Sequence, residues 1–238
     1  MNILLLGYGK MGKTIEKLAI DRGHKIALII DRGETEKLSQ IKDTDIDVAI
    51  EFTEPEAAVL NIRSCIDGGI PIVSGTTGWL QKYDEIKSYC EEKEGAFFYG
   101  SNYSIGVNIF FKLNEFLAKL MDTQDYELEM SETHHTEKKD APSGTAISIA
   151  EGIIKQNKKY TKWALDKNKK DDTEIPITAH RIENVPGTHE VIYHSDIDNI
   201  SIKHTAHSRK GFAFGAVLAA EWLKDKKGVF GMNDLLQF

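Results

Sequence analysis

The residue types that could do chemistry gather most densely in residues 132–146, which read Glu-Thr-His-His-Thr-Glu-Lys-Lys-Asp-Ala-Pro-Ser-Gly-Thr-Ala. His134, His135, Lys138 and Lys139 lie close together here, in a chain whose formal net charge is −7. The segment is therefore a local cationic patch on an acidic protein. Imidazole groups titrate near neutral pH, so the patch suits both proton transfer and the binding of an anionic small molecule.

A helix start follows the patch directly. Ser143 and Gly144 precede an apolar run with helical spacing, which consists of Ala146, Ile149, Ala150, Ile153 and Ile154. A serine in this place is typical of a helix N-cap, and the first turn of a helix offers unpaired N–H groups to an anion. We therefore expect Ser143, Gly144 and Thr145 to bind an anionic small molecule.

Size and composition narrow the class of protein. The 238 residues, 41% of them hydrophobic, suffice for one large domain or two modest ones. There is no apolar run long enough to span a membrane and no signal-peptide pattern, so we expect a cytoplasmic protein without a membrane partner. The acidic balance argues against a nucleic-acid partner. Cys65 and Cys90 have no cysteine nearby in the sequence, which indicates reduced thiols rather than a disulfide or a zinc site.

The start of the chain predicts a phosphate-binding turn. An apolar run at Asn2–Leu6 leads into Gly7-Tyr8-Gly9-Lys10-Met11-Gly12, which has the form G-x-G-x-x-G and precedes an amphipathic segment. This order predicts a strand, a tight turn and a helix whose N-terminus faces a pyrophosphate.

The end of the next strand bears on the choice of cofactor. The run Lys25–Ile30 predicts this strand, and it ends at Asp31, where a carboxylate can bind the ribose hydroxyls. The adjacent Arg32 could instead accept a 2′-phosphate. We therefore expect the cofactor to be NADH or NADPH, and the choice between them stays open.

Alternating strands and helices continue to about residue 103. Further strands are expected at 46–52, 71–74 and 96–99, with helices at 55–67 and 81–92. This alternation predicts a Rossmann-like, parallel, doubly wound sheet, whose ligands bind beyond the carboxyl ends of the strands. The expected cofactor rim therefore also includes Phe52, Gly75, Thr76, Thr77, Gly100, Ser101, Asn102 and Tyr103.

After Tyr103 the pattern predicts a second, α+β domain. A polar stretch at 158–174 is expected to be a solvated excursion. The other expected elements are helices at 107–121 and 145–156 and strands at 126–131, 175–181, 189–194 and 200–207. Tight turns between consecutive strands predict a largely antiparallel or mixed sheet.

The last helix is expected to return to the first domain. Residues 211–223 are strongly apolar, and a parallel sheet needs helices on both faces. We therefore expect a dinucleotide-binding domain of residues 1–103 with 209–238. Residues 104–208 are expected to form the second domain, which carries the cationic patch and therefore binds the substrate.

These residues together resemble one family closely, the 4-hydroxy-tetrahydrodipicolinate (dihydrodipicolinate) reductases. The core of the resemblance is Glu132-x-His134-His135-x-x-Lys138-x-Asp140 followed without a gap by Ala-Pro-Ser-Gly-Thr-Ala. The resemblance extends over nearly the whole chain, and its further segments are residues 7–12, 75–78, 101–108, 185–190, 208–209 and 212–216. Glu183 departs from the family pattern, which has a glycine before the Val-Pro-Gly segment.

The resemblance implies an activity and roles for residues. It implies reduction of 4-hydroxy-2,3,4,5-tetrahydrodipicolinate, a cyclic dicarboxylate, to tetrahydrodipicolinate with loss of water, in lysine and diaminopimelate biosynthesis. It also implies that His134 is the acid/base residue and Lys138 the proton donor, and that His135, Gly144 and Thr145 hold a substrate carboxylate. The family further implies a homotetramer assembled through the sheet of the substrate domain.

The residues also suggest two other classes of function, a metal site and a dinucleotide sensor. A metal site could use Glu132, His134, His135 and Asp140, but the helical spacing of a zinc protease is missing and the two lysines would repel a cation. We therefore expect no metal. A dinucleotide sensor without turnover would need the glycine turn but would have no use for a proton donor.

Overall fold

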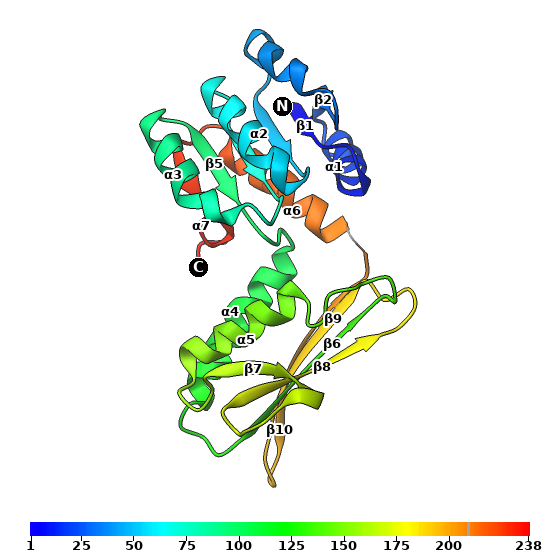
Figure 1. Cartoon of the computed structure of the whole chain (residues 1–238), viewed down its shortest axis with the longest axis vertical. Helices are drawn as coiled ribbons and strands as arrows, with labels where there is room; N and C mark the ends of the chain where they lie inside the picture. The colour runs from blue at the N-terminus through cyan, green and yellow to red at the C-terminus, as the bar shows by residue number, and fades with distance from the viewer. Residues whose placement is uncertain (209) are drawn as a thin grey trace. The chain divides into compact units, whose positions relative to one another are not determined.

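The computed structural model describes residues 1–208 and 210–238, and it divides into two compact units (Figure 1). Unit 1 comprises Met1–Ile105 and Lys210–Phe238, and unit 2 comprises Gly106–Arg209. Arg209, with which the predicted return to the first domain begins, lies outside the described residues. The assignment of a dinucleotide to one domain and of substrate to the other stays a prediction.

Unit 1 is built on a six-stranded sheet in the order β11-β5-β4-β3-β1-β2, with every pairing parallel. Its strands are β1 (Asn2–Leu6), β2 (Lys25–Ile30), β3 (Val48–Glu51), β4 (Ile72–Ser74), β5 (Ala96–Tyr99) and β11 (Gly228–Phe230). This confirms the predicted Rossmann-like sheet.

Helices cover both faces of that sheet because its strands are apolar on both sides. In β1, Ile3 and Leu5 face one core, and Leu4 and Leu6 face the other. The first core is completed by α1 (Lys10–Asp21), α6 (Lys210–Leu223) and α7 (Met232–Leu236). The second is completed by α2 (Pro55–Asp67), α3 (Tyr83–Glu92) and the 3-10 helix η1 (Thr35–Asp43), and η2 (Leu80–Lys82) precedes α3. Cys65 and Cys90 are buried free thiols in the second core.

Unit 2 has two layers. Its sheet has the order β10-β9-β6-β8-β7, formed by β6 (Glu127–His134), β7 (Lys162–Leu165), β8 (Glu174–Arg181), β9 (Gly187–His194) and β10 (Asn199–Ala206). Helices α4 (Ile105–Met121) and α5 (Gly144–Gln156) pack side by side on one face, where Asn114 Nδ2 donates to the Ile149 carbonyl at 3.0 Å (Figure 1). Within the residues placed here, no helix is both long and apolar enough to cross a bilayer.

One expectation needs correction. The polar stretch 158–174 is not only solvent-exposed chain, because β7 and the 3-10 helix η3 (Asp166–Asn168) lie within it and β7 pairs with β8. The second sheet, predicted to be largely antiparallel or mixed, is mixed, since β6, β8 and β7 pair in parallel while β6, β9 and β10 pair antiparallel. The sequence pattern did not predict strand β11 or helix α7. Such short elements carry little periodicity and depend on partners distant in the sequence.

The packing of α6 predicts a sharp difference between two of its glycines. A Cβ on Gly215 would lie 1.8 Å from the carbonyl oxygen of Tyr103, whereas one on Gly211 would lie 3.7 Å from its nearest neighbour. Gly215→Ala should therefore lower the melting temperature by several degrees or prevent folding, because overpacking typically costs ~1–3 kcal/mol or more. Gly211→Ala is the matched control and should leave the melting temperature equal or higher. Equal melting temperatures for the two variants would contradict this packing.

Candidate functional site

A cavity of about 280 Å³ opens at the carboxyl ends of β1, β2 and β3 in unit 1. It lies where the strand order reverses, because β2 flanks β1 on one side and β3 flanks it on the other. Doubly wound sheets bind ligands at this kind of switch point. Of the predicted cofactor residues, Gly7, Gly9, Asp31, Arg32 and Phe52 line the cavity.

Each of the three glycines of the turn has a different structural role. Gly7 has φ +89°, and a Cβ there would lie 2.1 Å from the Phe52 carbonyl oxygen. A Cβ on Gly12 would lie 2.2 Å from the Gly7 carbonyl oxygen, so this glycine allows α1 to pack against the turn. A Cβ on Gly9 would meet nothing within 4 Å. Gly9 therefore leaves open space beside the first turn of α1, which begins with Lys10 and Met11.

The charges at the end of β2 are more balanced than the sequence indicated. Asp31 Oδ1 accepts a hydrogen bond from the backbone N–H of Tyr8 at 3.1 Å, which ties the strand end to the glycine turn. Arg32 is exposed, and its Nη2 lies 3.3 Å from Glu54 Oε2. Glu54 also lines the cavity. Two carboxylates and one guanidinium thus lie at this end of the cavity.

The rest of the predicted rim lies at the ends of β4 and β5 and does not line this cavity. Gly75 is needed because a Cβ there would lie 2.2 Å from the Phe52 ring. Tyr103 is buried and donates its hydroxyl to the Ser74 carbonyl at 2.7 Å. Thr77 and Ser101 are exposed, Gly100 and Thr76 are buried, and Asn102 is half-buried. The first domain therefore does not gather all of its predicted cofactor residues around one cavity.

A buried carboxylate holds the ends of β3 and β4 together. Glu51 accepts hydrogen bonds from Ser74 Oγ at 2.5 Å, Thr76 Oγ1 at 2.6 Å and the Thr53 N–H at 2.9 Å, and also from the Thr53 hydroxyl. Glu51 was not predicted as a site residue. Its role is to fix the loops that follow both strands.

In unit 2, strand β6 carries Glu132 and His134 on its buried face, and β9 places His189 beside them. His134 Nδ1 lies 3.4 Å from Glu132 Oε2, and the two imidazole rings meet edge to face with centroids 5.1 Å apart. Gly187 leaves room for this arrangement, because a Cβ there would lie 3.1 Å from His134 Nε2. Within the described chain, His134 Nδ1 has no hydrogen-bond partner of suitable geometry.

Burial keeps both histidines neutral. Desolvation, followed by the neighbouring His134, lowers the pKa of His189 from 6.5 to about 4. Desolvation also lowers the pKa of His134, an effect that Glu132 opposes and that the positive charges of Lys138 and Arg181 reinforce. The lowered pKa favours the neutral form of His134, and a neutral imidazole can accept a proton.

The loop after β6 holds Lys138 in an ion pair that the sequence did not predict. Lys138 Nζ lies 2.9 Å from Asp140 Oδ2, and this contact is the main cause that lowers the pKa of Asp140. Arg181, at the end of β8, donates to the backbone carbonyls of Lys138 at 3.3 Å and Asp140 at 2.6 Å. Its Nη2 also lies 3.1 Å from Glu132 Oε1. The loop, β6 and β8 are therefore connected through one guanidinium.

The predicted helix start is present, and Ser143 is its N-cap. Ser143 Oγ accepts from the Ala146 N–H at 3.1 Å and lies 3.2 Å from His189 Nε2. The Ser143 N–H donates to both carboxylate oxygens of Glu132 at 3.1 Å. Gly144 is exposed, and a Cβ there would meet nothing within 4 Å, while Thr145 is half-buried. The first turn of α5 is thus anchored on its buried side and open at Gly144.

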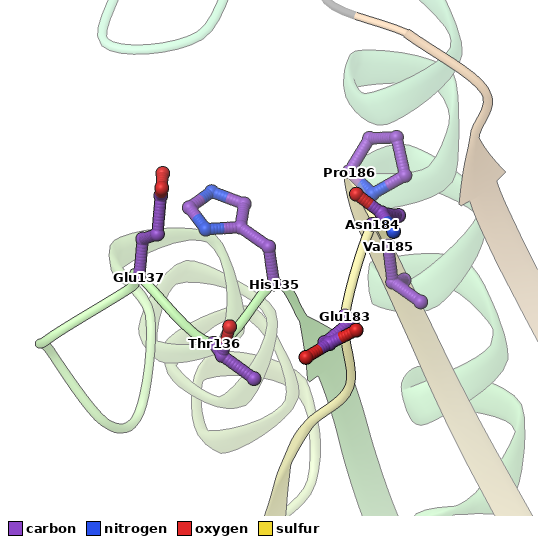
Figure 2. Close-up of a pocket in the computed structure, with 7 residues that line it drawn as sticks. All are labelled: His135, Thr136, Glu137, Glu183, Asn184, Val185 and Pro186. Atoms are coloured by element: carbon purple, nitrogen blue, oxygen red, sulfur yellow. The ribbon is translucent and has the colours of Figure 1, made fainter.

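His135 lines a separate cavity of about 480 Å³, of which none of these network residues is a lining residue (Figure 2). Figure 2 shows His135 and Glu137 on the loop after β6, and Asn184, Val185 and Pro186 on the loop between β8 and β9, which forms the other side of the cavity. Glu183, the departure from the family pattern, is exposed on that second loop. The left-handed conformation there, φ +61°, belongs to Asn184, so Glu183 needs no unusual backbone.

Glu132, His134 and His189 also present ligand atoms within 4.8 Å of one another, a spacing that could hold a metal ion. This set differs from the one weighed from the sequence, since His189 replaces His135 and Asp140. The Glu132 carboxylate, however, is already bonded to the Ser143 N–H and to Arg181, whose positive charge opposes a cation. We therefore interpret the cluster as a hydrogen-bonded ionic network.

Sequence reasoning missed His189, Arg181 and the pairing roles of Glu132 and Asp140. The two acidic residues belong to the motif, but the sequence suggested them only as possible metal ligands. His189 stood in the Val-Pro-Gly-Thr-His-Glu segment of the resemblance, which was its only signal. Arg181 had no signal, because its contacts join residues more than 40 positions apart.

Comparison with protein families gives two adjoining matches. Residues 1–103 match the family model described as dihydrodipicolinate reductase, N-terminus, and residues 106–236 match dihydrodipicolinate reductase, C-terminus. A relative from Christiangramia forsetii, named 4-hydroxy-tetrahydrodipicolinate reductase, is 52% identical over 237 residues, covering 99% of this chain and 98% of its own. A relative of the same name from Methanocaldococcus jannaschii is 40% identical and covers 82% of this chain and 73% of its own.

Solved structures show the same fold at lower sequence identity. The dipicolinate-bound dihydrodipicolinate reductase from Paenisporosarcina sp. TG-14 aligns with a TM-score of 0.78 at 19% identity, covering 98% of this chain and 99% of that one. An amine dehydrogenase from Mycobacterium smegmatis aligns with a TM-score of 0.64 at 10% identity, covering 96% and 94%. These likenesses concern the fold alone.

The lowered pKa of His189 predicts how stability depends on pH. In the unfolded chain His189 takes up a proton near pH 6.5, whereas in the folded chain it does so only near pH 4. Stability is therefore fully present above pH 6.5 and falls as the pH decreases toward 4. The full effect is on the order of 3 kcal/mol. Urea unfolding at pH 7 and pH 5 measures roughly half of this effect.

His189→Gln should reduce this dependence on pH, and the exposed His180→Gln is the matched control that should retain it. An unchanged slope in the His189 variant would show that another group causes the acid sensitivity.

Proposed function

The chain belongs to the dihydrodipicolinate reductase family, and from this we propose that it is the enzyme that reduces 4-hydroxy-2,3,4,5-tetrahydrodipicolinate to tetrahydrodipicolinate with loss of water. It is an oxidoreductase of lysine and diaminopimelate biosynthesis that uses a reduced nicotinamide cofactor. The observation that carries this conclusion is the match over nearly the full length to a relative of that name. The unbroken motif from Glu132 to Ala146 agrees with it.

We further propose that the cofactor binds at the cavity of unit 1. The open space at Gly9 suits a pyrophosphate beside the first turn of α1, and Asp31 is placed for ribose hydroxyls. When bound, the cofactor supplies a hydride. Arg32 would accept a 2′-phosphate, but Glu54 offsets its charge, which supports use of both NADH and NADPH.

The substrate is a dianion, and we propose that the cationic residues of unit 2 bind it. Gly144 and Thr145, at a helix start anchored by Ser143, would hold a carboxylate. The family resemblance implies that His135, on the loop after β6, would contribute to the same binding. Lys138 would donate the proton that the reduced ring requires, and His134 would act as the acid/base residue. Support for these roles comes from the motif, from the lowered pKa of His134 and from the ion pair that orients Lys138.

We also propose a cytoplasmic homotetramer assembled through the sheet of unit 2. The helices α4 and α5 cover only one face of that sheet. On its other face Glu127 and Glu129 of β6 are exposed in the single chain. A second copy is the occupant that the family resemblance implies. Size-exclusion chromatography with light scattering measures the number of copies.

The first functional prediction concerns His134. His134→Gln should lower kcat by ~10²–10⁴-fold, because general acid–base groups contribute about that much, while cofactor affinity stays the same. The measurement is oxidation of NADH or NADPH, followed by absorbance, with substrate generated in place by the preceding synthase. Wild-type protein that oxidises neither cofactor would refute the proposed function. An unchanged kcat in the variant would refute only the role of His134.

The second concerns cofactor choice. Arg32→Ala should weaken NADPH binding by up to about 10-fold and NADH binding by less, because a guanidinium favours a phosphate. Glu54→Gln should act in the opposite direction and improve NADPH relative to NADH. Calorimetric titration of both cofactors measures the ratio, with Arg63→Ala on α2 as the control. Equal effects of Arg32→Ala on both cofactors would show that Arg32 does not contact the phosphate.

A further inference from the structure

Arg181 makes more hydrogen bonds than the roles proposed above explain. It lies at the last residue of β8, and its guanidinium donates to the carbonyls of Lys138 at 3.3 Å, His180 at 2.7 Å and Asp140 at 2.6 Å. The same group donates to Glu132 Oε1 at 3.1 Å. Two of these four acceptors lie on either side of residue 139, so one side chain holds the backbone of the loop that carries Lys138.

The carboxylate that Arg181 contacts, that of Glu132, is buried away from solvent. The Glu132 side chain is 0% exposed, and the Arg181 side chain is 21% exposed. A buried carboxylate needs a compensating charge and a full set of hydrogen bonds. Across the described ranges, the ion-pair partners of Glu132 are Arg181, His134 and His189, and burial holds both histidines neutral. Arg181 is therefore the partner in this set that carries a full charge.

Glu132 in turn fixes the remaining parts of the site. Its two oxygens accept the Ser143 N–H at 3.1 Å and stand 3.4 Å from His134 Nδ1. A single ion pair thus connects the Lys138 loop, the His134 ring and the first turn of α5. Only a planar guanidinium, with several donors in a fixed geometry, reaches the carboxylate and two carbonyls at once.

We propose that Arg181 is a positioning residue for the reduction, which sets the location of Lys138 relative to His134 by joining the 138–140 loop to Glu132. The proposal rests on the roles of Lys138 and His134 in the proposed function. Arg181 acts through Lys138 and does not itself contact the reacting atoms. A lysine at this position would keep the charge but lose the bonds to the loop.

A double-mutant cycle tests this dependence. Arg181→Lys should lower kcat by about 10- to 100-fold, since displacement of a catalytic group by ~1 Å can cost this much, and should leave the cofactor KM within about 2-fold. On a Lys138→Met background, the same Arg181→Lys change should cost less than about 3-fold, because residues that act as one unit are not additive. Arg63→Lys, which alters an exposed pair with Glu85 on unit 1, is the matched control and should change nothing.

The outcomes separate this proposal from the proposed function. Full additivity in the cycle, or an unchanged kcat in Arg181→Lys, would overturn the positioning role and leave the enzyme class intact. Full activity in Lys138→Met would overturn both this inference and the assigned role of Lys138. Should Arg181→Lys fail to fold, Glu132→Gln reaches the same ion pair from the other side. Because Glu132 also contacts His134 and Ser143, its loss of kcat should be at least as large as that of Arg181→Lys, and part of this loss should disappear on the Lys138→Met background. Full additivity there would equally refute the proposal.

Discussion

The arrangement of unit 2 depends on the burial of one carboxylate. The side chain of Glu132 has no access to water, so its negative charge must be compensated by the Arg181 guanidinium and by the hydrogen bond from the Ser143 N–H. Each partner belongs to a different element: Arg181 ends β8, and Ser143 caps α5. Satisfying this single group therefore brings the end of the sheet, the helix start and the Lys138 loop to one place. The chemistry proposed for the site follows from an electrostatic requirement of the fold.

Unit 1 solves a similar problem with different groups. Glu51 is also fully buried, but it is held by hydroxyl groups of Ser74, Thr76 and Thr53 and by a backbone N–H. Hydroxyl donors stabilise the carboxylate without adding a cation beside the cavity of unit 1. In unit 2 the compensating charge is a guanidinium, which helps burial to lower the pKa of His134 and opposes the effect of Glu132. The two carboxylates thus organise strand ends with different kinds of partner.

The organisation of charge also explains why the two adjacent histidines differ. Neighbouring residues on a strand point to opposite faces, and β6 extends through His134. His134 therefore enters the buried network, while His135 lines the open cavity beside the β8–β9 loop. An acid/base group benefits from desolvation, which shifts its pKa, whereas a group that holds an anion benefits from access to the ligand. The division of roles proposed for the pair agrees with these positions.

Local patterns were sufficient to determine the parallel sheet, the glycine turn, the N-cap at Ser143 and the family, because each depends on residues close together in the chain. The mixed pairing of the second sheet, strand β7 within a polar stretch, and the short β11 and α7 were decided only by tertiary structure, since their stability comes from distant partners. The same holds for His189 and Arg181, which reach Glu132 from β9 and β8. A sequence shows which residues can carry charge, but only the packed sheet determines which charges must neutralise one another away from water.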